Sequence, residues 1–322
     1  MDHALSTLLS PVVLFFGLGF GAGLLRSSLA VPEALAKGLS LYLMLAIGFK
    51  GGVEMSHAHL DADVVSTVGL GLGAGFGLPV VAYALLRGFT RLERIDAASV
   101  AAHYGSISVV TFVAASDYLG GLSIGFDGYI IAVVALMETP AIIAGLWLAQ
   151  RGQGSPRRRG FDRELTREVF LNGSVVLLLG SLAIGWLTGD EGMRAIEPFI
   201  GAPFKGVLCL FLLDMGLAAS TRLRAAGGLE LRLIAFGLVM PLVGATFGLV
   251  GSALCGLPTG TAILLTVLCA SASYIAVPAA MRVALPQANP AYSLTLSLGI
   301  TFPFNIVVGI PVYTHLARAL LH

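Results

Sequence analysis

Two short runs of hydroxyl and glycine residues interrupt segments of the sequence that are otherwise apolar. The first run is HYGSISVVTF at 103–112, and the second is CASASYIAVP at 269–278. Ser and Gly weaken a helix, because Ser side chains compete for backbone hydrogen bonds and Gly is conformationally loose. A helix that restarts after such a break presents unpaired N–H groups and about half a positive charge at its N-terminus. Two such ends placed together can bind a small monoanion without Arg or Lys.

We predict that hydroxyl groups and backbone N–H groups from both runs hold this anion. The candidate residues are Ser106, Ser108, Val109, Val110, Thr111, Ser271, Ser273, Tyr274 and Ile275. An alternative interpretation is that Gly and Ser only allow neighbouring helices to pack closely. The presence of two aligned copies favours binding over packing.

Further polar residues lie inside apolar segments, where ionisable groups are rare and usually functional. Glu138 is a candidate sodium ligand or proton carrier, and Asp214 is a second candidate for the same role. His103 could carry protons, and Asn305 could offer an amide oxygen to an ion. The structural alternatives are a hydrogen bond to a neighbouring helix for Glu138 and a packing role for His103. For Asp214 they are pairing with Lys50 or Lys205, or capping of local backbone. Lys50 either takes the place of a bound cation or extends to the outer interface.

The composition places the chain in a bilayer. Of its 322 residues, 57% are hydrophobic and only 11% are charged, against about 25% charged in an average soluble domain. The net charge of +1 points to no nucleic-acid partner. The three cysteines lack metal-ligand spacing, so we expect no cofactor and no metal beyond a bound sodium ion. The N-terminus lacks a basic region, and we interpret it as a first membrane segment rather than a signal peptide.

The hydropathy pattern predicts ten membrane helices. A bilayer core of about 30 Å needs about 20 apolar residues per helix. Segments of this kind lie at 8–25, 38–56, 64–87, 97–116, 128–149, 169–188, 200–219, 233–255, 260–283 and 291–319. We expect the fourth and ninth helices, which contain the two runs, to be discontinuous.

The basic residues predict the orientation. The chain has 19 Lys and Arg residues. If the N-terminus is outside, all of them lie on the cytoplasmic side except four: Lys50, Arg194, Lys205 and Arg318. This asymmetry agrees with the positive-inside rule and places both termini outside. The charged stretch at 151–168 is then a cytoplasmic linker between two five-helix halves, 1–150 and 169–322.

The two halves resemble each other in sequence. YGSISVVTFVAAS at 104–116 aligns without gaps to CASASYIAVPAAM at 269–281. Three other short matches have nearly the same offset: those ending at Gly48 and Gly216, at Pro79 and Pro241, and at Pro140 and Pro303. Because each half has an odd number of helices, the second enters the membrane from the opposite side. The sequence therefore predicts an inverted repeat, which many secondary transporters share.

GSISVVTFVAA, METPAII and ASASYIAVPAAMRVALPQANPAYSLTLSLGITFPFNIVVGIP resemble the sodium-dependent bicarbonate transporter family, known from carbon-concentrating photosynthetic bacteria. The resemblance covers nearly the whole chain. It implies an all-helical membrane fold of two inverted five-helix repeats, a homotrimer, and bicarbonate and sodium bound between the crossing broken helices.

The family's site is matched in part. Ser108 and Thr111 match the ends of its Ser-Gly-Ser-Thr run, and Glu138 matches its acidic residue before a proline. Tyr274 stands where the family has an Asp, and Lys50 where a Thr is expected. The middle pair of the first run is replaced by Val109 and Val110. The long central-loop extension of the photosynthetic members is missing, so the resemblance supports a cytosolic PII-like regulator only weakly.

We therefore expect a secondary active transporter of a small anion in the bacterial inner membrane. Sodium-coupled bicarbonate uptake is the leading hypothesis. The alternatives are another small carboxylate or inorganic anion, proton coupling or none, or an anion channel on the same scaffold. An intramembrane hydrolase that uses Ser106 and His103 is a different class. It is disfavoured because no G-x-S-x-G elbow is present and the second run has no His. We expect neither an enzyme nor an ATP-driven pump, since no Walker motif occurs.

Overall fold

The computed structural model describes residues 11–57, 62–150, 173–225 and 229–321, and these residues form helices and connections without any strand. Seven helical runs in this described part are long and apolar enough to cross a bilayer. Two shorter apolar helices span Pro11–Leu24 and Thr259–Ala270. Helices suit this environment because they satisfy every backbone hydrogen bond within one segment. The chain is therefore a multi-pass, all-helical membrane protein.

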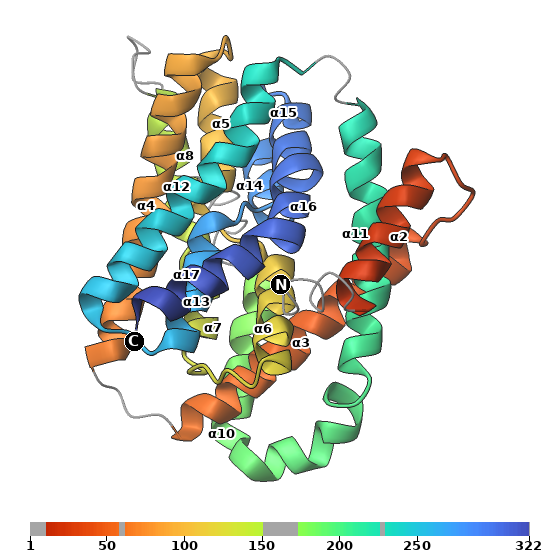
Figure 1. Ribbon diagram of the computed structural model, residues 1–322, viewed down its shortest axis with the longest axis vertical. Helices are drawn as coiled ribbons and strands as arrows, with labels where there is room; N and C mark the ends of the chain where they lie inside the picture. Colours follow the sequence, from red (N-terminus) through yellow and green to blue (C-terminus); the bar gives the residue numbers. More distant parts are fainter. Residues whose placement is uncertain (1–10, 58–61, 151–172, 226–228, 322) are drawn as a thin grey trace.

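Four helices form a group that we call the flanking bundle (Figure 1). It contains α2 (Pro11–Leu24), α3 (Glu33–His57), α10 (Gly173–Ile200) and α11 (Phe204–Ala225). Within it, α2 packs along α11 and α3 packs along α10. Glycines bring these backbones into contact, since a Cβ atom added at Gly19 would lie 2.0 Å from the carbonyl oxygen of Leu213. Small residues serve this purpose in membranes, where close packing drives helix association.

The remaining helices form the core bundle. They are α4 (Ala62–Phe89), α5 (Arg94–Gly105), α6 (Val109–Gly121), α7 (Ile130–Leu136), α8 (Glu138–Gln150), α12 (Leu231–Cys255), α13 (Thr259–Ala270), α14 (Ala276–Ala284) and a last run described below. The long helices α4 and α12 pack against each other. Each also supports an interrupted helix, α4 the end of α5 and α12 the end of α13.

The last run of the core bundle is irregular. It consists of α15 (Pro290–Leu294), the π-helix η1 (Thr295–Thr301), α16 (Phe302–Phe304), the π-helix η2 (Asn305–Gly309) and α17 (Ile310–Leu320). Pro303 and Pro311 lie in the first turns of α16 and α17 and remove two backbone donors. A missing donor disturbs the regular ladder, and π-helical turns often occur at functional sites.

The predicted segments overlap helices, with two differences in detail. The segment predicted to end at 188 turns a corner at Gly189 and continues in helical turns to Ile200 (Figure 1). The backbone angles of Gly189, φ 53° and ψ −144°, are ones that only Gly adopts readily. The segment 128–149 is divided at Met137 into α7 and α8. The predicted linker 151–168 lies outside the described residues.

Hydrogen bonds bring loops that are distant in the sequence together at each end of the molecule. At one end, Arg232 donates to the Phe89 carbonyl, and the backbone N–H of Asn289 donates to Asp96. At the other end, Lys205 pairs with Asp117, and Thr261 donates to Asp127. The first end carries loops predicted to be cytoplasmic, and the second carries loops predicted to be external. The described loops therefore group by their predicted sides.

Candidate functional site

Both predicted runs are breaks between helices. The chain leaves α5 after Gly105 and enters α6 at Val109, and it leaves α13 after Ala270 and enters α14 at Ala276. Ser106 and Ser271, the first residues beyond α5 and α13, both have extended backbone angles. The Ser and Gly content thus ends each helix inside the protein, where the released backbone groups can face protein rather than lipid.

The two breaks contact each other directly. The backbone N–H of Ser108 donates to the Ser271 hydroxyl at 3.0 Å. The backbone N–H of Ser273 donates to the His103 carbonyl at 2.8 Å. These two bonds, one in each direction, hold the interrupted helices together at one point, which we call the crossing. All four residues are at most 4% exposed.

Two serines of the crossing accept backbone N–H groups from the restarted helices, and Ser108 is the N-cap of α6. The Ser108 hydroxyl accepts the Thr111 backbone N–H at 3.1 Å, and the Ser273 hydroxyl accepts the Val277 N–H at 3.4 Å. Each therefore satisfies one free donor at the start of a restarted helix. The N–H groups of Val109 and Val110 have no partner among the described residues. They remain as donors at the positive end of α6.

Two other hydroxyls of the crossing are buried without any partner. Ser106 is 1% exposed and Thr111 is fully buried, and neither side-chain oxygen has a hydrogen bond in the described structure. The Tyr274 hydroxyl is also unpartnered, while its ring packs on Phe302 at a centroid distance of 5.4 Å. Unsatisfied buried hydroxyls are costly, so these oxygens are candidates for contact with a bound group.

A small cavity lies at the crossing, and Glu138 faces it. Its lining comes from both breaks and from α3 and α8: Met44, Ile107, Ser108, Val109, Glu138, Ser273, Tyr274 and Ile275. Its volume is about 10 Å³, close to the least that holds one water molecule. Glu138 is 5% exposed, and its carboxyl group has no hydrogen bond or ion pair with any described residue. The crossing is therefore closed in this structure, with one unpaired carboxyl in its wall.

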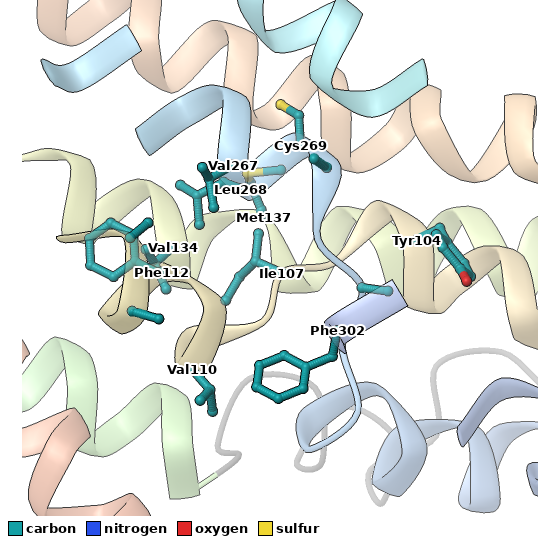
Figure 2. Packing of buried hydrophobic residues seen from close by; sticks show 14 of the residues in the cluster. Tyr104, Ile107, Val110, Phe112, Val134, Met137, Val267, Leu268, Cys269 and Phe302 are labelled. Carbon is teal, nitrogen blue, oxygen red and sulfur yellow. The ribbon is translucent and has the colours of Figure 1, made fainter. Parts of the chain in front are cut away.

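Apolar side chains pack around the crossing. Figure 2 shows Ile107, from the first break, next to Met137 at the junction of α7 and α8. Val110 is buried in the same apolar cluster, and its N–H remains a candidate donor. This packing excludes water and strengthens electrostatic interactions at the crossing. Four predicted anion-binding residues lie outside the lining of the central cavity: Ser106, Val110, Thr111 and Ser271.

Asn305 and Asp214, two of the predicted ion-coupling residues, lie outside the lining of the central cavity, and so does Lys50. Asn305 donates to the Ala270 carbonyl at 2.8 Å and accepts from Tyr313 at 3.1 Å, so it holds the end of α13. Asp214 lies half-buried on α11 in the flanking bundle. Lys50 lies over the Phe204 ring, 4.6 Å from its centroid, beside a cavity of about 750 Å³ at the Asp117 end. None of the three lines the central cavity.

Two polar residues of the crossing were not predicted from the sequence. The Tyr104 and Thr301 hydroxyls are 2.7 Å apart, and Thr301 donates to the Gly237 carbonyl at 2.7 Å. This chain of bonds links α5, η1 and α12. A signal was present, because the alignment of ETP with TFP places Thr301 opposite Glu138.

The hydrolase alternative lacks the necessary contact. A serine nucleophile needs a base within hydrogen-bond distance. The Ser106 hydroxyl has no partner, and the only hydrogen-bonded ring nitrogen of His103, Nδ1, lies 2.7 Å from the Ser99 carbonyl.

Paired interrupted helices that meet inside a multi-pass helical protein define a class, the membrane transport proteins. The whole-chain comparison agrees with this class and narrows it. The family model described as Na+-dependent bicarbonate transporter superfamily matches residues 11–318, and the chain belongs to this superfamily. No curated protein matches the chain.

Proposed function

We propose that this protein is a secondary active transporter that carries bicarbonate into the cell together with sodium, by alternating access. The superfamily supplies the class of solute and of coupling ion. The observation that carries the proposal is the crossing, where Ser108 bonds Ser271 and Ser273 bonds His103. It brings two helix N-termini, those of α6 and α14, close together.

The anion would be bound by groups that have no other partner. The N–H groups of Val109 and Val110 and the hydroxyls of Ser106 and Thr111 can all donate to oxygen atoms of an anion. The positive ends of α6 and α14 together supply roughly one positive charge. No Arg or Lys lines the central cavity, so these dipoles are the source of positive charge there.

Glu138 is the proposed carrier of the coupling ion. Its carboxyl group lines the same cavity as the oxygens of Ser108 and Ser273, and hard cations prefer oxygen ligands. A cation next to the bound anion would offset the charge of the anion during transfer. Proton coupling is the second candidate, because a single unpaired carboxyl can carry a proton in place of sodium.

We further propose ten membrane spans arranged as the inverted halves 1–150 and 169–322, with both termini outside. The helix packing supports this. In the inverted repeat α2 corresponds to α10 and α11 to α3, and the packing of α2 on α11 is matched by that of α10 on α3. In the same way α4 corresponds to α12 and α5 to α13, and the packing of α4 on α5 is matched by that of α12 on α13. Ser108 and Ser273 correspond in the same way. The homotrimer implied by the family stays a prediction.

Uptake of radiolabelled bicarbonate into proteoliposomes tests the transport proposal. We expect an inward sodium gradient to raise the initial rate, whereas an equal potassium gradient leaves it unchanged. Glu138→Gln, which keeps the shape and removes the charge, should abolish the sodium effect and lower the rate roughly tenfold, equivalent to about 1.4 kcal/mol. Glu191→Gln, on the exposed surface of α10, is the matched control.

Three outcomes separate the alternatives. Equal uptake in sodium and potassium, with stimulation by an inward proton gradient, would replace sodium by a proton. Ionic currents far above the turnover of a transporter would indicate a channel. The absence of bicarbonate uptake under every gradient would overturn the proposed function.

A further inference from the structure

A second cavity lies on the other side of the His103–Ser273 bond. Its volume is about 160 Å³. Ser99 and His103 of α5 and Met281 and Arg282 of α14 line it, together with residues of the α14–α15 connection. It shares no lining residue with the central cavity. It is therefore a separate space, and it lies at the end of the molecule predicted to be cytoplasmic.

His103 leaves one hydrogen-bonding atom unused beside this cavity. The residue is fully buried, and its Nδ1 lies 2.7 Å from the Ser99 carbonyl. Because a carbonyl only accepts, Nδ1 must carry the hydrogen, and in the neutral ring Nε2 is then an acceptor. Nε2 has no partner in the described structure. A ligand that satisfies it must donate a hydrogen.

Arg282 supplies the opposite chemistry in the same cavity. It lies in the last turn of α14, with its side chain exposed, and forms no ion pair or hydrogen bond with a described residue. A guanidinium group presents several donors in a planar fork and suits the oxygens of carboxylates and related anions. The cavity thus offers donors for anionic oxygens at one residue and an acceptor for a hydroxyl hydrogen at another.

We propose that the cavity between His103 and Arg282 is a second binding site, for a small oxyanion that also carries a hydroxyl group. Bicarbonate has both features, and the cavity is several times larger than the share of liquid volume of one water molecule, about 30 Å³. Its use as a station between the crossing and the cytoplasm rests on the proposed function. The Ser273 N–H bond to the His103 carbonyl is the contact that stands between the two sites.

Equilibrium binding of radiolabelled bicarbonate to the purified full-length protein in detergent tests this site. At mildly alkaline pH we expect two equivalents per chain for the wild type. Arg282→Gln and His103→Leu should each bind half as much. Arg318→Gln is the matched control, because Arg318 also lies exposed in the last turn of a helix but outside this cavity. It should bind two equivalents.

Several results would overturn the proposal. One equivalent or none in the wild type, or two in Arg282→Gln, would remove the site. Two equivalents in a folded His103→Leu variant would remove His103 from it. The Arg282 variant alters an exposed side chain, so it tests the site even if the buried His103 variant does not fold. If the wild type binds one equivalent but takes up bicarbonate in proteoliposomes, the second site is overturned and the transport function is retained. If it binds two equivalents but shows no uptake, the transport function is overturned and the second site is retained.

Discussion

At the scale of single residues, the hydroxyl groups of the crossing fall into two kinds. Those of Ser108 and Ser271 are engaged, because Ser108 caps α6 and Ser271 links the two breaks. Those of Ser106 and Thr111 are buried and unpartnered. Replacing an unpartnered buried hydroxyl by an apolar group of the same shape can be neutral or stabilising, so stability alone does not require these two hydroxyls. The second kind is therefore the better candidate for contact with the anion.

Thr111→Val separates function from stability. It removes an unpartnered hydroxyl and keeps the shape, so thermal unfolding in detergent should show equal or higher stability. The rate of bicarbonate uptake should fall roughly tenfold, which corresponds to a loss of about 1.4 kcal/mol in the stabilisation of the rate-limiting state.

Thr266→Val is the matched control. Thr266 is also fully buried on a helix of the core bundle, but its hydroxyl donates to the Ala262 carbonyl at 2.7 Å. Its replacement should lower stability by about 1 kcal/mol and leave uptake unchanged. Normal uptake by Thr111→Val would remove this hydroxyl from the site.

At the scale of helices, the breaks are held in place by close contacts with two long helices. A Cβ atom added at Gly244 of α12 would lie 2.0 Å from the carbonyl oxygen of Cys269, near the end of α13. A Cβ atom added at Gly105, the end of α5, would lie 2.1 Å from the ring of Pro79 on α4. In both halves a long helix therefore touches the half-helix that precedes the break. These contacts hold the ends of the two interrupted helices against α4 and α12.

Gly244→Ala should disturb the crossing from outside it. Because the atom in the way is backbone, α12 and α13 must separate, and we expect a loss of about 1–3 kcal/mol in the free energy of unfolding. Gly77→Ala on α4 is the control, since nothing lies within 4 Å of its added Cβ atom. It should change stability by less than about 0.5 kcal/mol. Thermal unfolding in detergent measures both, and equal stability of the two variants would contradict the contact.

At the scale of the whole molecule, the flanking and core bundles pack against each other. Phe16 of α2 packs edge-on against Phe302 of α16, with ring centroids 5.5 Å apart, and α11 packs against η1. The crossing is closed in this structure, with larger cavities on its two sides. The proposed alternating access would require movement, and we expect the two bundles to shift against each other.

A cross-link between the bundles should stop transport. A Cβ atom at Gly299 of η1 would lie 3.5 Å from the Cβ of Arg222 on α11, within the range for a disulfide. Oxidation of the Arg222→Cys, Gly299→Cys variant, with the exposed Cys255 replaced by Ser, should abolish uptake, and reduction should restore it. The two single-cysteine variants should transport under both conditions. Full uptake by the cross-linked protein would show that the bundles do not move apart at this contact.

The sequence by itself determined the membrane location and the two breaks, and it predicts the pairing of the halves. These properties depend on local composition: apolar length sets the spans, and Ser and Gly at 103–112 and 269–278 interrupt helices wherever those helices lie. The sequence also singled out Glu138, because one carboxyl in an apolar segment is conspicuous without any structure.

Only the tertiary structure decided which of the selected polar groups are free. Thr111 and Ser108 look equivalent in the sequence, yet one is unpartnered and the other is a cap. Asn305 is occupied by Ala270 and Tyr313, and Arg282 joins His103 from a different helix. A hydrogen bond depends on two atoms within about 3 Å, often from residues far apart in the chain, and no local pattern records that distance.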